Sequence, residues 1–215
     1  MVFDMFWNSR FSWWLLIFVL VADFIVPALL AFGYKGYSRT RRVISVLSST
    51  GSPVKRLCRF WMLLQGVLFA IAGVNLFLYY QSVSYTVALW LMITLIVFAV
   101  LEGIIASFYS IEEDTSKLTT SAVIHNMASV TAFAALSFAP LFMAVLMFRQ
   151  RELLLGGVST VCFAAALGFQ ALFLFSIGPA HHRGILGLSG LWQRAALFSM
   201  YLPLAAAAVK ILYNY

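Results

Sequence analysis

Six long apolar runs divide this chain and fix the class of structure that it can form. They cover residues 11–34, 60–80, 83–109, 121–148, 153–179 and 191–213. Each run is long enough to cross a membrane as a helix, since about 30 Å of hydrocarbon takes about 20 residues. A helix also satisfies its own backbone hydrogen bonds in hydrocarbon. We therefore predict an all-α, polytopic membrane protein, a six-transmembrane-helix bundle with short connections.

The composition leaves little material for a separate soluble domain. Of the 215 residues, 63% are hydrophobic and only 10% are charged, whereas a soluble domain carries about 25% charged residues. The first run is longer than the apolar part of a signal peptide and has no basic segment before it, so we interpret it as a retained span. Residues 1–215 are predicted to form a single integral membrane domain.

The net charge of +7 comes largely from one connection, residues 35–59, which we call loop one. Loop one holds seven of the fourteen basic residues: Lys35, Arg39, Arg41, Arg42, Lys55, Arg56 and Arg59. Beside membrane spans, such a cluster indicates a topology signal or a contact with anionic lipid head groups. We therefore expect membrane lipids as partners and no binding of nucleic acid.

The lengths of the connections predict how the spans alternate. Gln81–Ser82 and Arg149–Glu152 are short, whereas loop one and the connections at 110–120 and 180–190 are long. With six spans the three long connections share one side, the loop face, and both termini lie on the opposite side. Most basic residues belong to the loop face, so the positive-inside rule predicts that it is cytoplasmic. The expected location is a bacterial cytoplasmic membrane.

Four ionisable residues interrupt the apolar runs: Asp23, Glu102, His125 and Arg194. A charged side chain at the centre of a membrane helix costs at least about 2.5–3.5 kcal/mol, so such residues usually face a bundle interior or a water-filled cavity. All four lie on different spans and toward the loop face. We therefore predict one shared polar pocket that opens to the loop face, with loop one as its basic rim.

Three chemical interpretations of this pocket remain open. The first is a divalent metal that activates water, with ligands drawn from His125, His181, His182 and Asp114, although no sequence spacing enforces their convergence. The second is a proton or cation relay through Asp23 or Glu102. In the third, Arg194 pairs with one of these carboxylates for structural reasons alone.

Three stretches resemble the DUF998 family of six-helix membrane proteins. Gly36–Ser38 followed by Val43–Leu47 resembles one family segment, and His125–Ala128 resembles the start of a later helix. Gly187–Arg194 resembles the closing family motif. The resemblance implies the six-helix architecture and a distant similarity to Frag1/DRAM-type proteins, some of which are linked to lipid-anchor remodelling.

The resemblance also implies a set of family-like polar positions, and the chain departs from the family pattern at two places. The positions are Ser45, Asp114, His125, Gln193 and Arg194. Val46 replaces an expected acidic residue, and Tyr109–Glu113 lacks the Pro-Cys that precedes the family aspartate. The family's loop one is usually external, opposite to what the basic residues of this chain predict.

These observations lead to a prediction of lipid or anionic head-group interaction at the polar pocket, with hydrolysis or remodelling as the activity. Whether the chain is an enzyme stays open, and neither a cofactor nor a metal is assigned. The expected catalytic residues are His125, Asp114 and Glu102. The expected substrate-binding residues are Asp23, Arg194, Gln193, Ser45, Arg41 and Arg42. One alternative is a non-enzymatic subunit or assembly factor of a membrane complex, and another is a small proton-coupled transporter. A membrane-protein partner or a homo-oligomer is also possible on this prediction.

Overall fold

The computed structural model describes residues 6–7, 9–112, 119–177 and 184–214, and within them it shows helices and no strands. Six helical stretches are long and apolar enough to cross a membrane, as the sequence predicts. Four of them are α2 (Arg10–Leu30, continued by the short 3₁₀ turn η1, Ala31–Gly33), α3 (Lys55–Tyr80), α8 (Leu153–Ser176) and α9 (Ser189–Tyr213). The fold class is confirmed: an all-α integral membrane protein.

The third span is built from three consecutive helical segments rather than one. α4 (Tyr85–Phe98) passes into a π-helical stretch, η3 (Ala99–Ile105), and ends in α5 (Ala106–Phe108). Single π-helical turns inside α-helices are rare and occur frequently at functional sites. Glu102 lies within this stretch, so the change of helix geometry helps to set the direction of its side chain.

The fourth span is interrupted near its middle. α6 (Thr120–Leu136) ends just before α7 (Ala139–Arg149), whose first turn contains Pro140. Proline has no amide hydrogen and its ring clashes with the carbonyl four residues earlier, which breaks the helix. Ser137 fills part of the gap, because its hydroxyl donates to the carbonyl of Phe133 at 2.8 Å.

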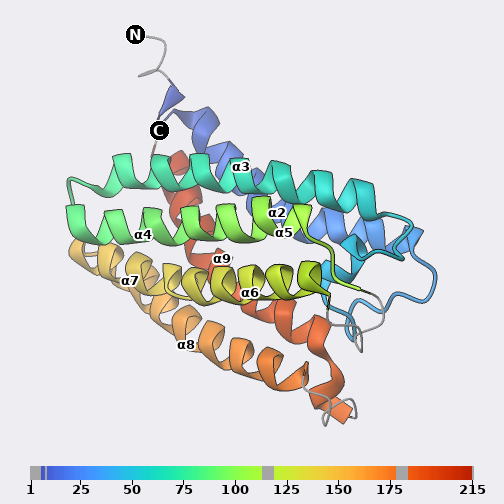
Figure 1. The fold of residues 1–215 in the computed structure, drawn as a ribbon. Helices are drawn as coiled ribbons and strands as arrows, with labels where there is room; N and C mark the ends of the chain where they lie inside the picture. The colour runs from blue at the N-terminus through green and yellow to red at the C-terminus, as the bar shows by residue number, and fades with distance from the viewer. Residues whose placement is uncertain (1–5, 8, 113–118, 178–183, 215) are drawn as a thin grey trace.

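The spans form a ring in which each one packs on the next along the chain, and α9 returns to pack on α2 (Figure 1). Large side chains such as Trp13, Phe69 and Met143 are fully buried inside this ring. Apolar side chains on the outside, among them Phe18 and Val161, stay more than half exposed. Such an outer surface suits contact with lipid chains rather than with water.

The two ends of the bundle are built differently. At one end, the Trp13 ring of α2 packs edge-on against Tyr79 of α3, with ring centroids 5.1 Å apart. There Lys210 of α9 also forms a 2.6 Å ion pair with Glu152, which precedes α8. The other end carries the long connections, including η2 (Ile44–Ser48), a 3₁₀ helix in loop one (Figure 1). This second end is the loop face.

A glycine contact joins α3 to η3 beside Glu102. A Cβ atom on Gly103 would lie 2.4 Å from the Cα of Gly66, and a Cβ on Gly66 would lie 2.8 Å from the carbonyl oxygen of Ala99. Both are backbone atoms that no side-chain rotation can move away. Small residues at helix contacts allow such close approach in membrane proteins. The two glycines therefore set the distance between α3 and the segment that carries Glu102.

Candidate functional site

Arg194, one of the four ionisable residues in the apolar runs, binds loop one. Its Nη1 donates to the carbonyl oxygens of Arg39 at 2.7 Å and of Gly190 at 2.8 Å. Its Nη2 donates to the hydroxyl of Tyr37 at 3.1 Å. The guanidinium group therefore connects the first turn of α9 to loop one, and its described hydrogen bonds use no carboxylate. The predicted pairing with Asp23 or Glu102 is not what the structure shows.

The neighbours of Arg194 hold the same part of loop one. The backbone N–H of Leu191 donates to Thr40 at 2.9 Å, and the Ser189 hydroxyl donates to Arg41 at 2.7 Å. The Gln193 side-chain oxygen accepts from the Ile44 N–H at 2.7 Å. We call these contacts between residues 189–194 and residues 37–44 the loop-one clamp.

Gly190 allows the clamp to close. A Cβ atom at this position would lie 2.2 Å from the carbonyl oxygen of Arg42 and 2.5 Å from that of Arg39. Only a residue without a side chain lets these two carbonyls approach the start of α9 so closely. The clamp in turn fixes η2, which directly follows residue 43 and lies over the interior of the bundle at the loop face.

Tyr37 completes the clamp from within loop one. Its hydroxyl accepts from Arg194 and lies 3.2 Å and 3.1 Å from the carbonyl oxygens of Arg42 and Val43, to which it donates. Burial raises the pKa of Tyr37 above its ordinary value of 10.0, although the neighbouring Arg194 charge acts in the opposite direction. The phenol therefore keeps its proton at neutral pH and serves as donor and acceptor together.

Beneath η2, a small cavity lies between the helices, and we call it the inner cavity. Its volume is about 20 Å³, which is enough for one water molecule. The polar groups that line it come from α2, loop one, α3, η3 and α9: Asp23, Ser45, Cys58, Gln65, Glu102 and Gln193. Five separate parts of the chain thus bring polar side chains to one point.

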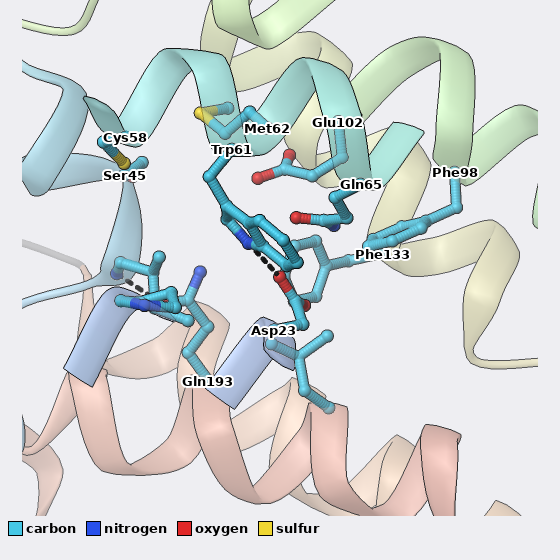
Figure 2. A pocket seen from close by; sticks show the side chains of 13 residues that line it. Asp23, Ser45, Cys58, Trp61, Met62, Gln65, Phe98, Glu102, Phe133 and Gln193 are labelled. Carbon is cyan, nitrogen blue, oxygen red and sulfur yellow. Dashed lines mark hydrogen bonds between the residues drawn. The ribbon is translucent and has the colours of Figure 1, made fainter. Parts of the chain in front are cut away.

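Asp23 is buried, with 6% of its surface exposed, and both of its oxygens accept hydrogen bonds. Trp61 donates its indole N–H to Oδ1 at 3.1 Å, and Tyr201 donates its hydroxyl to Oδ2 at 2.8 Å. Figure 2 shows the Trp61 ring reaching from α3 to this carboxyl group. The two donors are neutral, so they orient the carboxyl group without cancelling a negative charge on it.

Glu102 approaches the inner cavity from η3 and is half-buried. The hydroxyl of Ser129 on α6 donates to its Oε2 at 2.5 Å. Gln65, which is 5% exposed, points its carboxamide toward the same space from α3 (Figure 2). The inner cavity therefore combines two carboxyl groups with a neutral amide.

A larger opening, which we call the cleft, lies between α6, α8 and loop one and has a volume of about 370 Å³. Its apolar lining includes Val130 and Phe133 of α6 and Phe173 of α8, with Ile177 just after α8. Its polar lining consists of Ser45, Glu112, His125, Asn126, Ser129 and Gln193. α8 packs mainly on α7 and α9, which leaves room for the cleft between its loop-face end and α6.

His125 forms part of the cleft wall and is 1% exposed. Its Nδ1 lies 3.0 Å from the carbonyl oxygen of Ala106 and 2.8 Å from that of Tyr109. Carbonyl oxygens only accept, so Nδ1 carries the proton and the lone pair of the neutral ring is on Nε2. Nε2 is buried without a hydrogen-bond partner in the described part of the chain. Nε2 is therefore a buried acceptor on a residue that lines the cleft.

The structure divides the predicted pocket into two neighbouring sites. Asp23 and Glu102 line the inner cavity, His125 lines the cleft, and Ser45 and Gln193 line both. Arg194 belongs to the loop-one clamp instead. The Arg41 side chain is exposed and that of Arg42 is half-buried, so these two residues lie in loop one outside both linings.

Three of the predicted catalytic or metal-binding residues have no described position. Asp114, His181 and His182 lie outside the described residues. Among the residues that are described, no group of three or more His, Cys, Asp or Glu side chains is positioned to hold a metal ion. The predicted catalytic pairing of His125 with Asp114 stays a prediction.

Sequence reasoning missed the two aromatic partners of Asp23. Trp61 lies in the second turn of α3, near the loop face, where an aromatic side chain often serves as an interfacial anchor. Tyr201 lies in the middle of α9, where an aromatic side chain usually serves packing. A buried Trp or Tyr usually finds a hydrogen-bond partner for its polar atom. That rule gives the only available signal, and it does not name the partner.

A comparison with models of protein families shows which family this chain is related to. The model described as "Protein of unknown function (DUF998)" matches residues 17–210, which is most of the chain. The chain belongs to the DUF998 family. No curated protein and no solved structure matches this DUF998 protein.

The resemblance predicted from short motifs is thereby confirmed, and the structure gives two of the motifs a physical role. Tyr37 and Ile44 come from the loop-one segments, and residues 189–194 come from the closing motif. In this DUF998 protein they meet in the loop-one clamp. The third motif places His125 at the cleft, so all three motifs lie around the same end of the bundle.

Proposed function

We propose that this DUF998 protein binds a membrane lipid, with part of an acyl chain in the cleft and the polar head at the cleft's loop-face rim. The observation that carries the proposal is the composition of the cleft wall. Val130, Phe133 and Phe173 provide an apolar surface, while His125 and Asn126 provide polar atoms beside it. A volume of about 370 Å³ lies within the usual range for ligand pockets, about 300–1,000 Å³.

The charges of the cleft narrow the kind of head group. Glu112 is the charged residue of the described lining, which contains no Lys or Arg. His125 offers the Nε2 lone pair, and Ser129 already donates its hydroxyl to Glu102. The described lining thus carries one carboxylate and no basic side chain, which favours a head group with an ammonium donor over an anionic one. Arg194, expected to bind an anionic head group, instead uses its guanidinium in the loop-one clamp.

Retained lipid in native mass spectra tests this proposal. We expect wild-type protein, extracted in mild detergent and incubated with phosphatidylethanolamine, to retain one lipid. Val130→Trp should fill the cleft and lower the retained fraction by about tenfold, as expected for a loss of about 1.4 kcal/mol of binding free energy. The matched control is Val209→Trp, because Val209 lies 56% exposed on the outer surface of α9 and does not line the cleft.

The outcomes separate the classes of function. Equal lipid retention in Val130→Trp and Val209→Trp would contradict binding in the cleft. Retained lipid with the mass of a cleaved product would indicate the hydrolase or remodelling activity, with His125 Nε2 as the base. A stoichiometric protein partner without retained lipid would support the alternative, a subunit or assembly factor of a membrane complex.

For the topology, we propose that the loop face lies in the cytoplasm of a bacterial cell and that both termini lie across the cytoplasmic membrane from it. The exposed basic residues Lys35, Arg41 and Arg56 of loop one support this orientation through the positive-inside rule. A single cysteine at Arg41, in a variant lacking Cys58 and Cys162, should react with a membrane-impermeant maleimide only after the cells are opened. Labelling of intact cells would reverse the orientation.

A further inference from the structure

We propose that Asp23 and Glu102 form a proton-binding pair at the inner cavity, which holds one exchangeable proton at neutral pH. This site is separate from lipid binding in the cleft and does not depend on it. The pair is formed by tertiary structure alone, because Asp23 comes from α2 and Glu102 from η3. Four further observations, on charge, on hydrogen-bond partners, on Gln65 and on the surrounding groups, carry the proposal.

The first observation concerns charge. In the described residues neither carboxyl group forms an ion pair, and the hydrogen bonds shown for Arg59 and Arg194 go to other groups. Arg59 of α3 donates to the Ser110 hydroxyl, and Arg194 of α9 donates to loop one. Two uncompensated negative charges inside a membrane protein are costly, and a carboxylate disfavours the ionisation of a second one nearby. The pair therefore favours a state with a single negative charge.

The second observation concerns the partners of the two carboxyl groups. Each has one hydroxyl partner, Tyr201 for Asp23 and Ser129 for Glu102. A hydroxyl donates to an ionised carboxylate and accepts from a protonated carboxyl group, so it satisfies both states. Trp61 can only donate, which keeps Oδ1 of Asp23 as an acceptor throughout. Proton gain and loss therefore require hydroxyl rotation rather than the breaking of hydrogen bonds.

The third observation is Gln65. This residue is 5% exposed and lines the inner cavity together with both carboxyl groups. In the view of Figure 2, its carboxamide is drawn between the carboxyl groups of Glu102 and Asp23, which line the same cavity. A buried amide needs hydrogen-bond partners, and water in the cavity can supply them. The cavity volume of about 20 Å³ accommodates one water molecule, through which a proton can pass between the carboxyl groups.

The remaining titratable groups around the pair do not replace it as the site of the proton. Cys58 of α3 lines the cavity, and Tyr201 of α9 contacts Asp23. Both are weak acids that ordinarily stay neutral at neutral pH. His125 of α6 directs its Nδ1 to the backbone carbonyls of residues 106 and 109, and it lines the cleft rather than the inner cavity. The two carboxyl groups are the acids that can exchange a proton under physiological conditions.

Infrared spectra of the purified protein in lipid nanodiscs test this proposal directly. A protonated carboxyl group gives a C=O stretching band that shifts when H₂O is replaced by D₂O. At neutral pH we expect the wild type to show such a band, equivalent to one carboxyl group per molecule. The double variant Asp23→Asn, Glu102→Gln should lose it completely, whereas Glu152→Gln, which removes the surface partner of Lys210, should keep it.

The wild-type spectrum alone can overturn the proposal, even where a variant fails to fold. A wild type without the band would show that both carboxyl groups are ionised. A band that persists in a monodisperse double variant would place the proton elsewhere. Loss of the wild-type band on addition of sodium chloride at constant pH would show that the cavity takes a metal cation in place of a proton. None of these results depends on whether lipid occupies the cleft.

Discussion

Replacing Gly103 by alanine is expected to lower the free energy of unfolding by about 1–3 kcal/mol or more, because the added methyl group has no space. Its Cβ would lie 2.4 Å from the Gly66 Cα, 2.9 Å from the Gly66 nitrogen and 3.1 Å from the Met62 carbonyl oxygen. These are backbone atoms of α3, so α3 and η3 have to separate. Unfolding by sodium dodecyl sulfate added to detergent micelles, followed by circular dichroism, measures the loss.

The matched control is the same substitution at Gly168 of α8. A Cβ atom there meets nothing within 4 Å, and the residue lies inside a regular helix. Glycine to alanine at such a site reduces the entropy of the unfolded chain and stabilises by about 0.4–1 kcal/mol. The two substitutions should therefore change stability in opposite directions. Equal effects would show that the Gly66–Gly103 contact does not set the distance between the helices.

Replacing Arg194 by alanine should release loop one while leaving the six helices in place. Three hydrogen bonds from a charged group are lost, to Arg39, Gly190 and Tyr37, of which the Arg39 and Tyr37 bonds hold loop one. Each bond to a charged group contributes about 1.5–3 kcal/mol, so the lower value for these two gives about 3 kcal/mol. A loss of about 3 kcal/mol from local stability corresponds to about a hundredfold faster amide exchange. Hydrogen–deuterium exchange of residues 37–48, measured by mass spectrometry, reports this change.

Two further variants make the Arg194 result specific. Arg41→Ala removes an exposed basic side chain from the same loop but leaves the Arg41 carbonyl, which accepts from Ser189. It should leave the exchange of loop one unchanged. Arg194→Lys keeps the charge without the planar fork that reaches several acceptors, so its effect should be intermediate. Slow exchange of loop one in Arg194→Ala would contradict the clamp.

The opening of loop one would also affect the inner cavity. Ile44 and Ser45 of η2 line its loop-face side, and the Ile44 N–H is held by Gln193. When the clamp opens, this cover loses its attachment to α9. The fast exchange in Arg194→Ala should therefore extend into η2, up to Ser48, rather than stop at Val43.

The spans could be predicted from sequence because their length and apolarity follow from the thickness of the hydrocarbon. The position of a residue along such a span predicts its depth, and it placed Asp23, Glu102 and His125 toward the loop face. Depth does not predict the direction of a side chain around the helix axis. For that reason the sequence predicted one pocket, whereas His125 faces the cleft and Asp23 faces the inner cavity.

Arg194 also shows that depth along a span does not predict the direction of a side chain. Its depth matched that of the two acids, and charge complementarity suggested a pair with one of them. A long arginine side chain can extend toward the membrane surface, however, and carry its charge away from the helix position. In the structure it reaches the carbonyls of loop one, an interaction across 155 residues of sequence separation for Arg39.

By itself, the sequence determined six membrane-spanning helices, the loop face with its basic residues and the DUF998 relationship. These follow from local composition, chain order and short motifs. Only the tertiary structure decided which polar groups meet: Asp23 with Trp61 and Tyr201, Glu102 with Ser129, and Arg194 with loop one. The physical reason is that helix rotation, the π-helical turn at η3 and the Gly66–Gly103 contact depend on packing between distant segments.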